Sequence, residues 1–119
     1  MILFTEEHKE WILRASPYTG CPKTQTRRFW NKPRAKAGSI HQARTKMFGK
    51  PFARLLIREV WSQKVRDITL SDVRAEGYKT CIEFWMVLCE VNHIPLIRMN
   101  KILDRDCYAV RFELQEALE

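Results

Sequence analysis

The chain has 119 residues, of which 45% are hydrophobic and 29% are charged, and its formal net charge is +7 at pH 7. This balance is typical of a folded single domain over residues 1–119, and it excludes disorder, collagen-like repeats and coiled coils for the whole chain. The longest apolar run, Phe84 to Cys89, is far shorter than the roughly 20 residues of a membrane span, and the N-terminus is unlike a signal peptide because it turns acidic after five residues.

The first half of the chain predicts one helix among short strands. Thr5 is placed to cap a helix whose first turn holds two glutamates and which ends near Arg14 or Ala15. The residues after it, up to Pro22, have turn chemistry. Residue propensity and alternation then predict strands at Met1–Phe4, Thr24–Trp30, Gly38–Ala43 and Phe52–Trp61.

The second half predicts helices first and a strand last. Thr69 and Thr80 each precede an acidic residue by three positions, which is the capping-box spacing, and Gly77 is placed to end the first of these two helices. The second helix runs to about Val91. Residues 93–106 are ambiguous, and a strand in part of them is one option. Cys107–Leu114 alternates as a half-buried strand.

These elements together predict an α+β domain with a curled, mainly antiparallel sheet and two or three helices. The helix over residues 81–91 is apolar almost all round, because only Glu83 and Glu90 are charged in it. Such a helix either lies in the core or contacts another protein, and we expect the core in a domain of this size.

The positive charge is concentrated in one stretch of the sequence. No Asp or Glu occurs between Trp11 and Arg58, whereas twelve Lys and Arg residues do, and aromatic residues are interleaved with them. A solvated basic face is one interpretation. We favour a nucleic-acid surface, since cations bind phosphates and aromatic rings stack on unpaired bases. An anionic membrane is a weaker alternative, because prolines and glycines break the stretch and no amphipathic basic helix is visible.

The cysteines and histidines show no metal-ligand spacing. No cysteine pair forms Cys-x-x-Cys and the three histidines are scattered, so the sequence predicts no metal site and no cofactor. Free thiols suit a reducing, cytoplasmic setting.

Five short motifs occur in the order typical of one family. They are Lys23-Thr-Gln-Thr-Arg-Arg28, Phe52-Ala-Arg-Leu-Leu-Ile57, Asp67-Ile-Thr69, Glu76-Gly-Tyr78 and Tyr108-Ala-Val-Arg-Phe112. With them the chain resembles the ASCH domain family, a branch of the PUA-like superfamily, from Met1 to about Leu114. The family's signature is a Gly followed by Lys-x-x-Thr-x-Arg, and one departure is visible: Gly20 precedes the lysine by three residues, where the family has two.

The resemblance implies a PUA-like small β-barrel with a cleft, and RNA or nucleotide partners. Family members have been linked to RNA binding, transcription coactivation and RNA cleavage. One branch looks like an amidohydrolase of N4-acetylcytidine that uses a Lys, a Thr and a Glu. By motif position, these catalytic residues would be Lys23, Thr26 and Glu76.

The chemistry of this trio is coherent under one geometric condition. A neutral Lys23 can take the proton of the Thr26 hydroxyl, and the adjacent cations Arg27 and Arg28 favour the neutral amine. On a regular strand, however, Lys23 points away from Thr26, so the pair requires Lys23 to lie in a turn before the strand or at a bulge. Alternatives stay open: Lys23 as a phosphate contact, and Glu76 as an exposed residue or as the partner of Arg28.

We therefore expect an RNA- or nucleoside-binding protein with a cationic cleft, either with or without hydrolysis. As an enzyme it would be an amidohydrolase on acylated cytidine, or a metal-independent ribonuclease that uses Lys23 with Tyr18 or Glu76. We expect no membrane partner and favour a monomer, with a dimer through the apolar helix as the alternative. The expected nucleic-acid contacts are Arg27, Arg28, Trp30, Lys32, Arg34, Lys36, Arg44 and Lys46.

Overall fold

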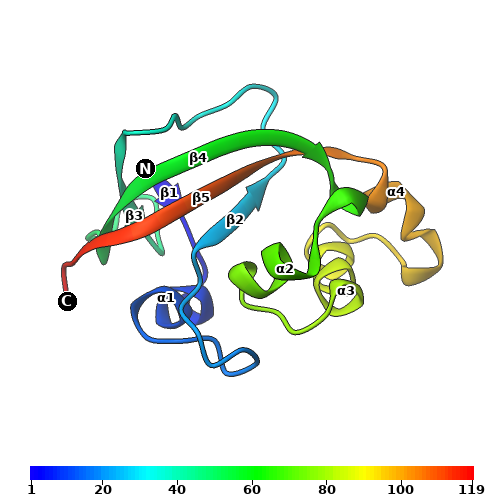
Figure 1. Ribbon diagram of the computed structural model, residues 1–119, viewed down its shortest axis with the longest axis horizontal. Helices are drawn as coiled ribbons and strands as arrows, with labels where there is room; N and C mark the ends of the chain where they lie inside the picture. The colour runs from blue at the N-terminus through cyan, green and yellow to red at the C-terminus, as the bar shows by residue number, and fades with distance from the viewer.

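The computed structural model describes residues 1–119 and is built on one curled five-stranded sheet, shown in Figure 1. Its strand order is β1-β3-β4-β5-β2. The pair β1–β3 is parallel and the other three pairs are antiparallel. The sheet forms a half-barrel, which confirms the predicted curled α+β fold. The strands are β1 (Ile2–Leu3), β2 (Gln25–Arg28), β3 (Ile40–Arg44), β4 (Ala53–Lys64) and β5 (Asp106–Ala117).

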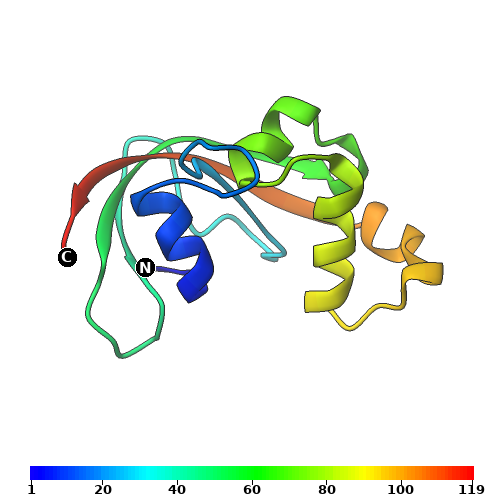
Figure 2. The ribbon, with the colours of Figure 1, turned by 90° about the horizontal axis from the view of Figure 1, so that it is seen from below.

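The helices lie mainly under the arch that β4 and β5 form, as Figures 1 and 2 show. They are α1 (Glu6–Leu13), α2 (Leu70–Glu76), α3 (Cys81–Val91) and α4 (Asn100–Leu103), with 3-10 turns at Val65–Asp67 and Leu96–Arg98. None of them has both the length and the apolar composition needed to cross a membrane.

The predicted helix caps are confirmed. The hydroxyls of Thr5, Thr69 and Thr80 each accept a hydrogen bond from a backbone N–H three residues later, which satisfies a donor that the first helical turn leaves free. Gly77 ends α2 in the left-handed conformation with φ 108°. The helix boundaries in this part of the chain are therefore set by local residue chemistry.

Residues 93–106 contain no strand before Asp106, so the strand option for this segment is wrong. A 3-10 turn follows Pro95, and the short helix α4 follows Met99. This helix brings the number of α-helices to four, one more than predicted. Strand lengths also differ from the prediction: β2 spans only four residues, while β4 continues three residues past Trp61 because it pairs with β5 as far as Lys64.

Two apolar clusters hold the sheet and the helices together. The larger one joins the inner face of β4 and β5 to β1 and α1, and includes Leu55, Ile57, Val110, Phe112 and Ile12. The smaller one lies among α1, α2 and α3 and comprises Trp11, Ile68, Val73, Tyr78 and Phe84. α1 joins the two clusters, because Ile12 belongs to the larger one and Trp11 to the smaller one.

The expectation that α3 is a core helix is wrong for much of its surface. Only Phe84 and Cys89 are buried in it, whereas Ile82, Met86 and Val91 are exposed, Val91 to 68%. The neighbouring elements cover one stripe of α3 and leave the opposite side open. Leu114, the last residue of the predicted half-buried strand, is also exposed, since β5 is exposed beyond Phe112.

Candidate functional site

Lys23 lies in the segment that joins α1 to β2 and is not part of a regular strand. Its backbone N–H donates to the Trp11 carbonyl at 2.9 Å, and the next N–H, of Thr24, donates to the Ala75 carbonyl at 2.8 Å. These two bonds fix the segment between the end of α1 and the end of α2. The geometric condition for a Lys23–Thr26 pair, that Lys23 precedes the strand, is met.

The Lys23 side chain is inside the protein and is held by Glu76. Lys23 is 2% exposed, and its Nζ donates to the Glu76 backbone carbonyl and to Glu76 Oε1, both at 2.9 Å. Glu76 is the last residue of α2 and is itself only 3% exposed. The alternative that Glu76 is an exposed surface residue is therefore wrong.

Arg27 is the second cation on the same carboxylate. Its Nη1 donates to Glu76 Oε2 at 2.9 Å, and its Nε donates to Gln63 Oε1 at 2.9 Å. A weaker ion pair of 3.5 Å joins it to Asp72, while Gln25 bonds both Arg27 and Asp72. Glu76 thus pairs with Lys23 and Arg27, and not with Arg28 as one alternative had it. The Arg27 guanidinium points into the protein, away from any phosphate in solution.

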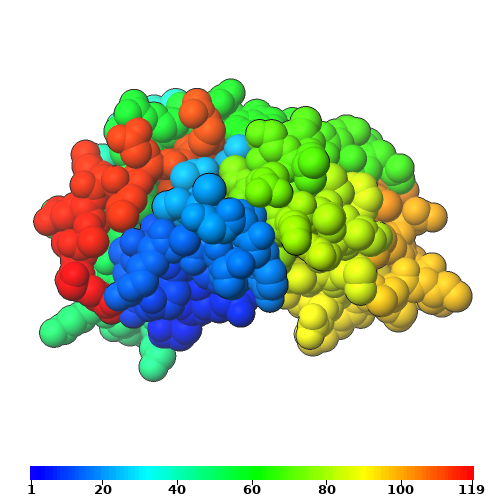
Figure 3. Space-filling view, turned by 60° about the horizontal axis from the view of Figure 1, so that its bottom comes forward, coloured from blue at the N-terminus to red at the C-terminus, as the bar shows by residue number.

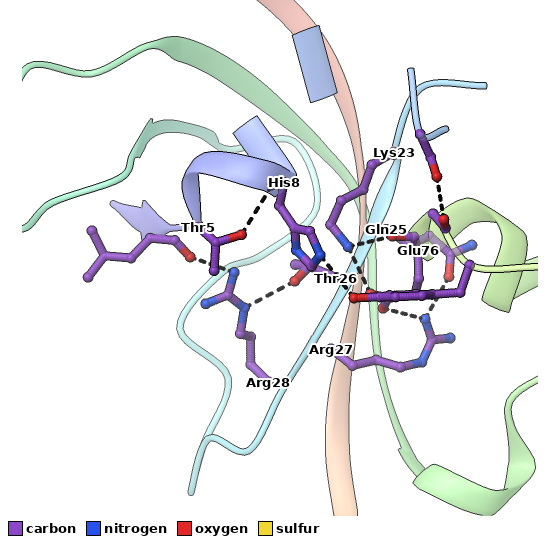
Figure 4. Close-up of polar contacts among 12 residues, drawn as sticks. Thr5, His8, Lys23, Gln25, Thr26, Arg27, Arg28 and Glu76 are labelled. Carbon is purple, nitrogen blue, oxygen red and sulfur yellow. Dashed lines mark hydrogen bonds and ion pairs between the residues drawn. The ribbon is translucent and has the colours of Figure 1, made fainter. Parts of the chain in front are cut away.

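Thr26 is 4% exposed, and its hydroxyl accepts a hydrogen bond from Arg28 Nε at 3.1 Å. Arg28 also donates to the Leu3 carbonyl at 2.7 Å and lies 5.0 Å over the Phe4 ring, so it is fixed by β1. Figure 4 shows Lys23, Thr26 and His8 converging on one space beside Glu76. Lys23 and Thr26 do not hydrogen-bond to each other there.

His8 is a member of the site that sequence reasoning missed. It lies on the inner side of α1, stacks on Trp11 at 4.5 Å between ring centroids, and shares a 3.0 Å hydrogen bond between its Nε2 and the Tyr78 hydroxyl. Burial, then the charges of Lys23 and Arg28, lower the pKa of His8 to about 3. Burial also raises the pKa of Tyr78, so both rings are neutral at pH 7. The sequence signal that could have identified His8 is its position three residues before Trp11, which places the two side chains on the same face of α1.

The environment of Lys23 makes its ammonium easier to deprotonate. Burial lowers the pKa of Lys23, and Arg28 and Arg27 lower it further, against the opposing effect of Glu76. Arg27 neutralises Glu76 from the other side, so the carboxylate keeps a counter-ion when Lys23 loses its proton. A neutral amine has two N–H donors, and Glu76 accepts both, which leaves the nitrogen lone pair free to take a proton.

The other predicted nucleic-acid residues are spread over several elements. Trp30 packs on the larger apolar cluster and lies 6.3 Å from the Tyr108 ring, while Arg44 is half-buried and donates to Gln42 and the Gly49 carbonyl. Four are exposed and have no carboxylate partner: Lys32, Arg34 and Lys36 on the loop after β2, and Lys46 on a different loop between β3 and β4. Arg34 and Lys36 line a shallow pocket with His41.

A larger cavity lies beside the buried site. It has a volume of about 660 Å³ and is lined by Tyr18, Tyr78, α3 and residues 94–96. Figure 3 shows the hollow between the N-terminal segment and α3. Tyr78 belongs to both places, since it lines the cavity and its hydroxyl shares a hydrogen bond with His8. The structure brings together no group of three or more His, Cys, Asp or Glu side chains that could hold a metal ion.

Comparison with solved structures places the fold among ASCH domains. The chain superposes on an ASCH domain from Lactobacillus crispatus JV V101 with a TM-score of 0.59 at 14% identity, covering 96% of this chain and 77% of that one. It also superposes on protein EF3133 from Enterococcus faecalis V583, of family DUF984, with a TM-score of 0.64 at 15% identity, covering 95% and 72%. No family model matches the sequence, and no curated protein does. The chain has the fold of an ASCH domain, as its motifs had indicated.

Proposed function

We propose that the protein hydrolyses the amide of an N4-acylated cytidine, with Thr26 as nucleophile and Lys23 as base. The observation that carries this proposal is a lysine amine, 2% exposed, held beside Thr26 by a carboxylate that a second cation already neutralises. Burial of this kind lowers the pKa of an amine toward the range in which it acts as a base at neutral pH. By the order of the sequence motifs, these residues would stand at the family's Lys, Thr and Glu positions.

The steps balance with water as the only co-reactant. Thr26 Oγ1 attacks the acyl carbon while its proton passes to Lys23 Nζ. The bond from that carbon to N4 breaks, N4 takes the proton from Lys23, and cytidine leaves. Water, deprotonated by Lys23, then attacks the acyl–threonine ester. The bond from the acyl carbon to Thr26 Oγ1 breaks, Oγ1 takes the proton back from Lys23, and the acyl group leaves as a carboxylic acid. Glu76 positions the amine throughout. Because Lys23 and Thr26 are almost fully covered, access requires the side chains around them to move.

The test is release of cytidine from N4-acetylcytidine, followed by chromatography. We expect Thr26→Ala to lower kcat/KM at least about 100-fold and Thr26→Ser to recover part of that loss, since it keeps a hydroxyl. Thr24→Ala, an exposed threonine two residues earlier, is the matched control and should stay within about twofold of wild type. The rate should rise with pH until Lys23 is deprotonated, because only the neutral amine is a base.

Two results would contradict this proposal. One is a wild-type protein that is inert at high enzyme concentration while circular dichroism shows it folded. The other is a Thr26→Ala variant that keeps the wild-type rate.

The loop after β2 supports RNA binding as a second candidate function. Its three exposed cations, Lys32, Arg34 and Lys36, have no carboxylate partner, whereas Arg54, Arg58 and Lys64 on β4 are each paired with an acid of β5. Cations without an acidic partner are available to bind phosphates, so we propose that this loop binds single-stranded RNA. Arg27 is left out of this surface because Glu76 holds it inside the protein.

Salt dependence separates these two sets of cations. For single-stranded RNA, the triple variant K32A/R34A/K36A should lower the slope of log K against log salt concentration by about 2, since each lost phosphate contact contributes about 0.7. The control triple R54A/R58A/K64A removes the same number of positive charges and should leave the slope nearly unchanged. Equal changes in both variants would show that net charge alone sets the affinity.

A further inference from the structure

The cavity beside α3 is an apolar groove with an acidic rim, and we call it the α3 groove. Its lining is mainly apolar, with Tyr18, Met86 and Leu96 exposed within it. Its charged members are Glu83 and Glu90, both exposed, and neither forms an ion pair within the chain. The groove therefore fits an occupant that is apolar at its centre and positively charged at its edges.

The loop between β3 and β4 complements this groove, because it is apolar at its centre and positively charged at its edges. We call residues 45–50 the 45–50 loop. Phe48 at its tip is 96% exposed, which makes it the most exposed large hydrophobic side chain of the protein. Met47 beside it is also exposed. Lys46 and Lys50 flank the pair, and both are exposed without a carboxylate partner. The loop thus presents two apolar side chains between two cations, without contacts that would cover them.

The two features lie at opposite ends of the molecule. In Figure 1 the turn between β3 and β4 is at the left of the view, below the sheet, while α3 is at the right, beyond α1 and α2. Figure 3 shows the same separation, with the loop protruding at the lower left and the groove between the N-terminal segment and α3. A loop cannot reach the groove of its own chain across the helices, so any contact between them joins two molecules.

We propose that the 45–50 loop of one copy docks in the α3 groove of a second copy of this chain. Phe48 and Met47 then cover the apolar walls, and Lys46 and Lys50 approach Glu83 and Glu90. The contact is heterologous, because each molecule offers a loop at one end and a groove at the other. This inference is independent of the proposed hydrolase activity.

The small size of the contact sets the expected strength. Two apolar side chains bury a few hundred Å², well below the area of a stable interface, so association should be weak and visible from about 10 µM to 1 mM. Higher salt should weaken it, since the rim contacts are between exposed charges. Sedimentation equilibrium over this concentration range measures the effect directly.

Complementation between two variants is the decisive experiment. Phe48→Ser removes the docking side chain and leaves the groove, while Met86→Lys places a repelling cation in the groove and leaves the loop. Each variant alone should be monomeric at every concentration. An equimolar mixture should form a 1:1 heterodimer and nothing larger, because the pair retains one working loop and one working groove. Leu70→Ser, which removes an exposed apolar side chain from α2, is the control and should associate as wild type does.

Three outcomes would overturn the proposal. The first is a wild-type protein that stays monomeric up to about 1 mM, and the second is a mixture of the two variants that fails to associate. A monomeric protein whose RNA affinity falls in Phe48→Ser would instead assign the loop to RNA bases. Circular dichroism of both variants excludes unfolding as the cause of a lost contact.

Discussion

Glu76→Gln is expected to lower the free energy of unfolding by about 3–5 kcal/mol, whereas Lys23→Met should lower it by only about 1–2 kcal/mol. The difference follows from the position of Glu76 between two buried cations. Without the carboxylate, the one ion-pair partner left to Arg27 is Asp72 at 3.5 Å, and the guanidinium cannot lose its proton. Without Lys23, Glu76 still has Arg27, so no buried charge is left without a counter-ion.

Urea unfolding of the two single variants and of the double variant K23M/E76Q measures this asymmetry. In the double variant the lysine cation is absent, so adding Lys23→Met to Glu76→Gln should cost less than Lys23→Met costs alone. Equal destabilisation by the two single variants would contradict the account, because it would mean that Arg27 contributes nothing to the neutralisation of Glu76. Arg27→Met, which removes the other cation, completes the comparison.

Gly77→Ala is expected to destabilise the protein by about 4 kcal/mol, from two separate causes. A residue with a side chain at φ 108° is strained by about 1–3 kcal/mol. In addition, a Cβ at this position would lie 2.4 Å from Cε3 of the buried Trp11 ring, and overpacking of this kind costs about 1–3 kcal/mol more.

Gly20→Ala separates these two causes. Gly20 also has a positive φ, 71°, but a Cβ there meets no atom within 4 Å. The Gly20 variant should therefore show the conformational strain alone, about 1–2 kcal/mol. Thermal and urea unfolding of both variants give the comparison. If Gly77→Ala destabilises the protein no more than Gly20→Ala does, the Trp11 ring moves aside without a cost in free energy.

Local chemistry explains why much of the fold could be predicted from the sequence. The three threonine caps and Gly77 act within a few residues of themselves, so their positions in the sequence suffice to place the ends of α2 and the starts of α1, α2 and α3. Lys23 follows Pro22, and this turn chemistry was enough to allow its place before β2. The motif order then indicated the ASCH fold, which the solved structures match.

The remaining features depend on contacts between residues far apart in the chain. Lys23 and Glu76 are 53 positions apart, and His8 and Tyr78 are 70 apart, so no local pattern could show that each pair is joined. The exposure of α3 is of the same kind. Its all-round apolar composition indicates burial, but only the packing of α1 and α2 decides which side stays open.

The placement of β2 has a consequence for the order in which the protein is made. The strand that carries Thr26, Arg27 and Arg28 is at the edge of the sheet, and its one neighbour is β5, with residues 25–28 paired to residues 108–111. During synthesis β2 leaves the ribosome long before its partner. Until β5 has emerged, neither β2 nor the long edge of β4 is paired, and such edges invite contacts with other chains. The strand that carries Thr26 therefore cannot take its place in the sheet before β5 has emerged, and the site depends on a segment that contributes no residue to it.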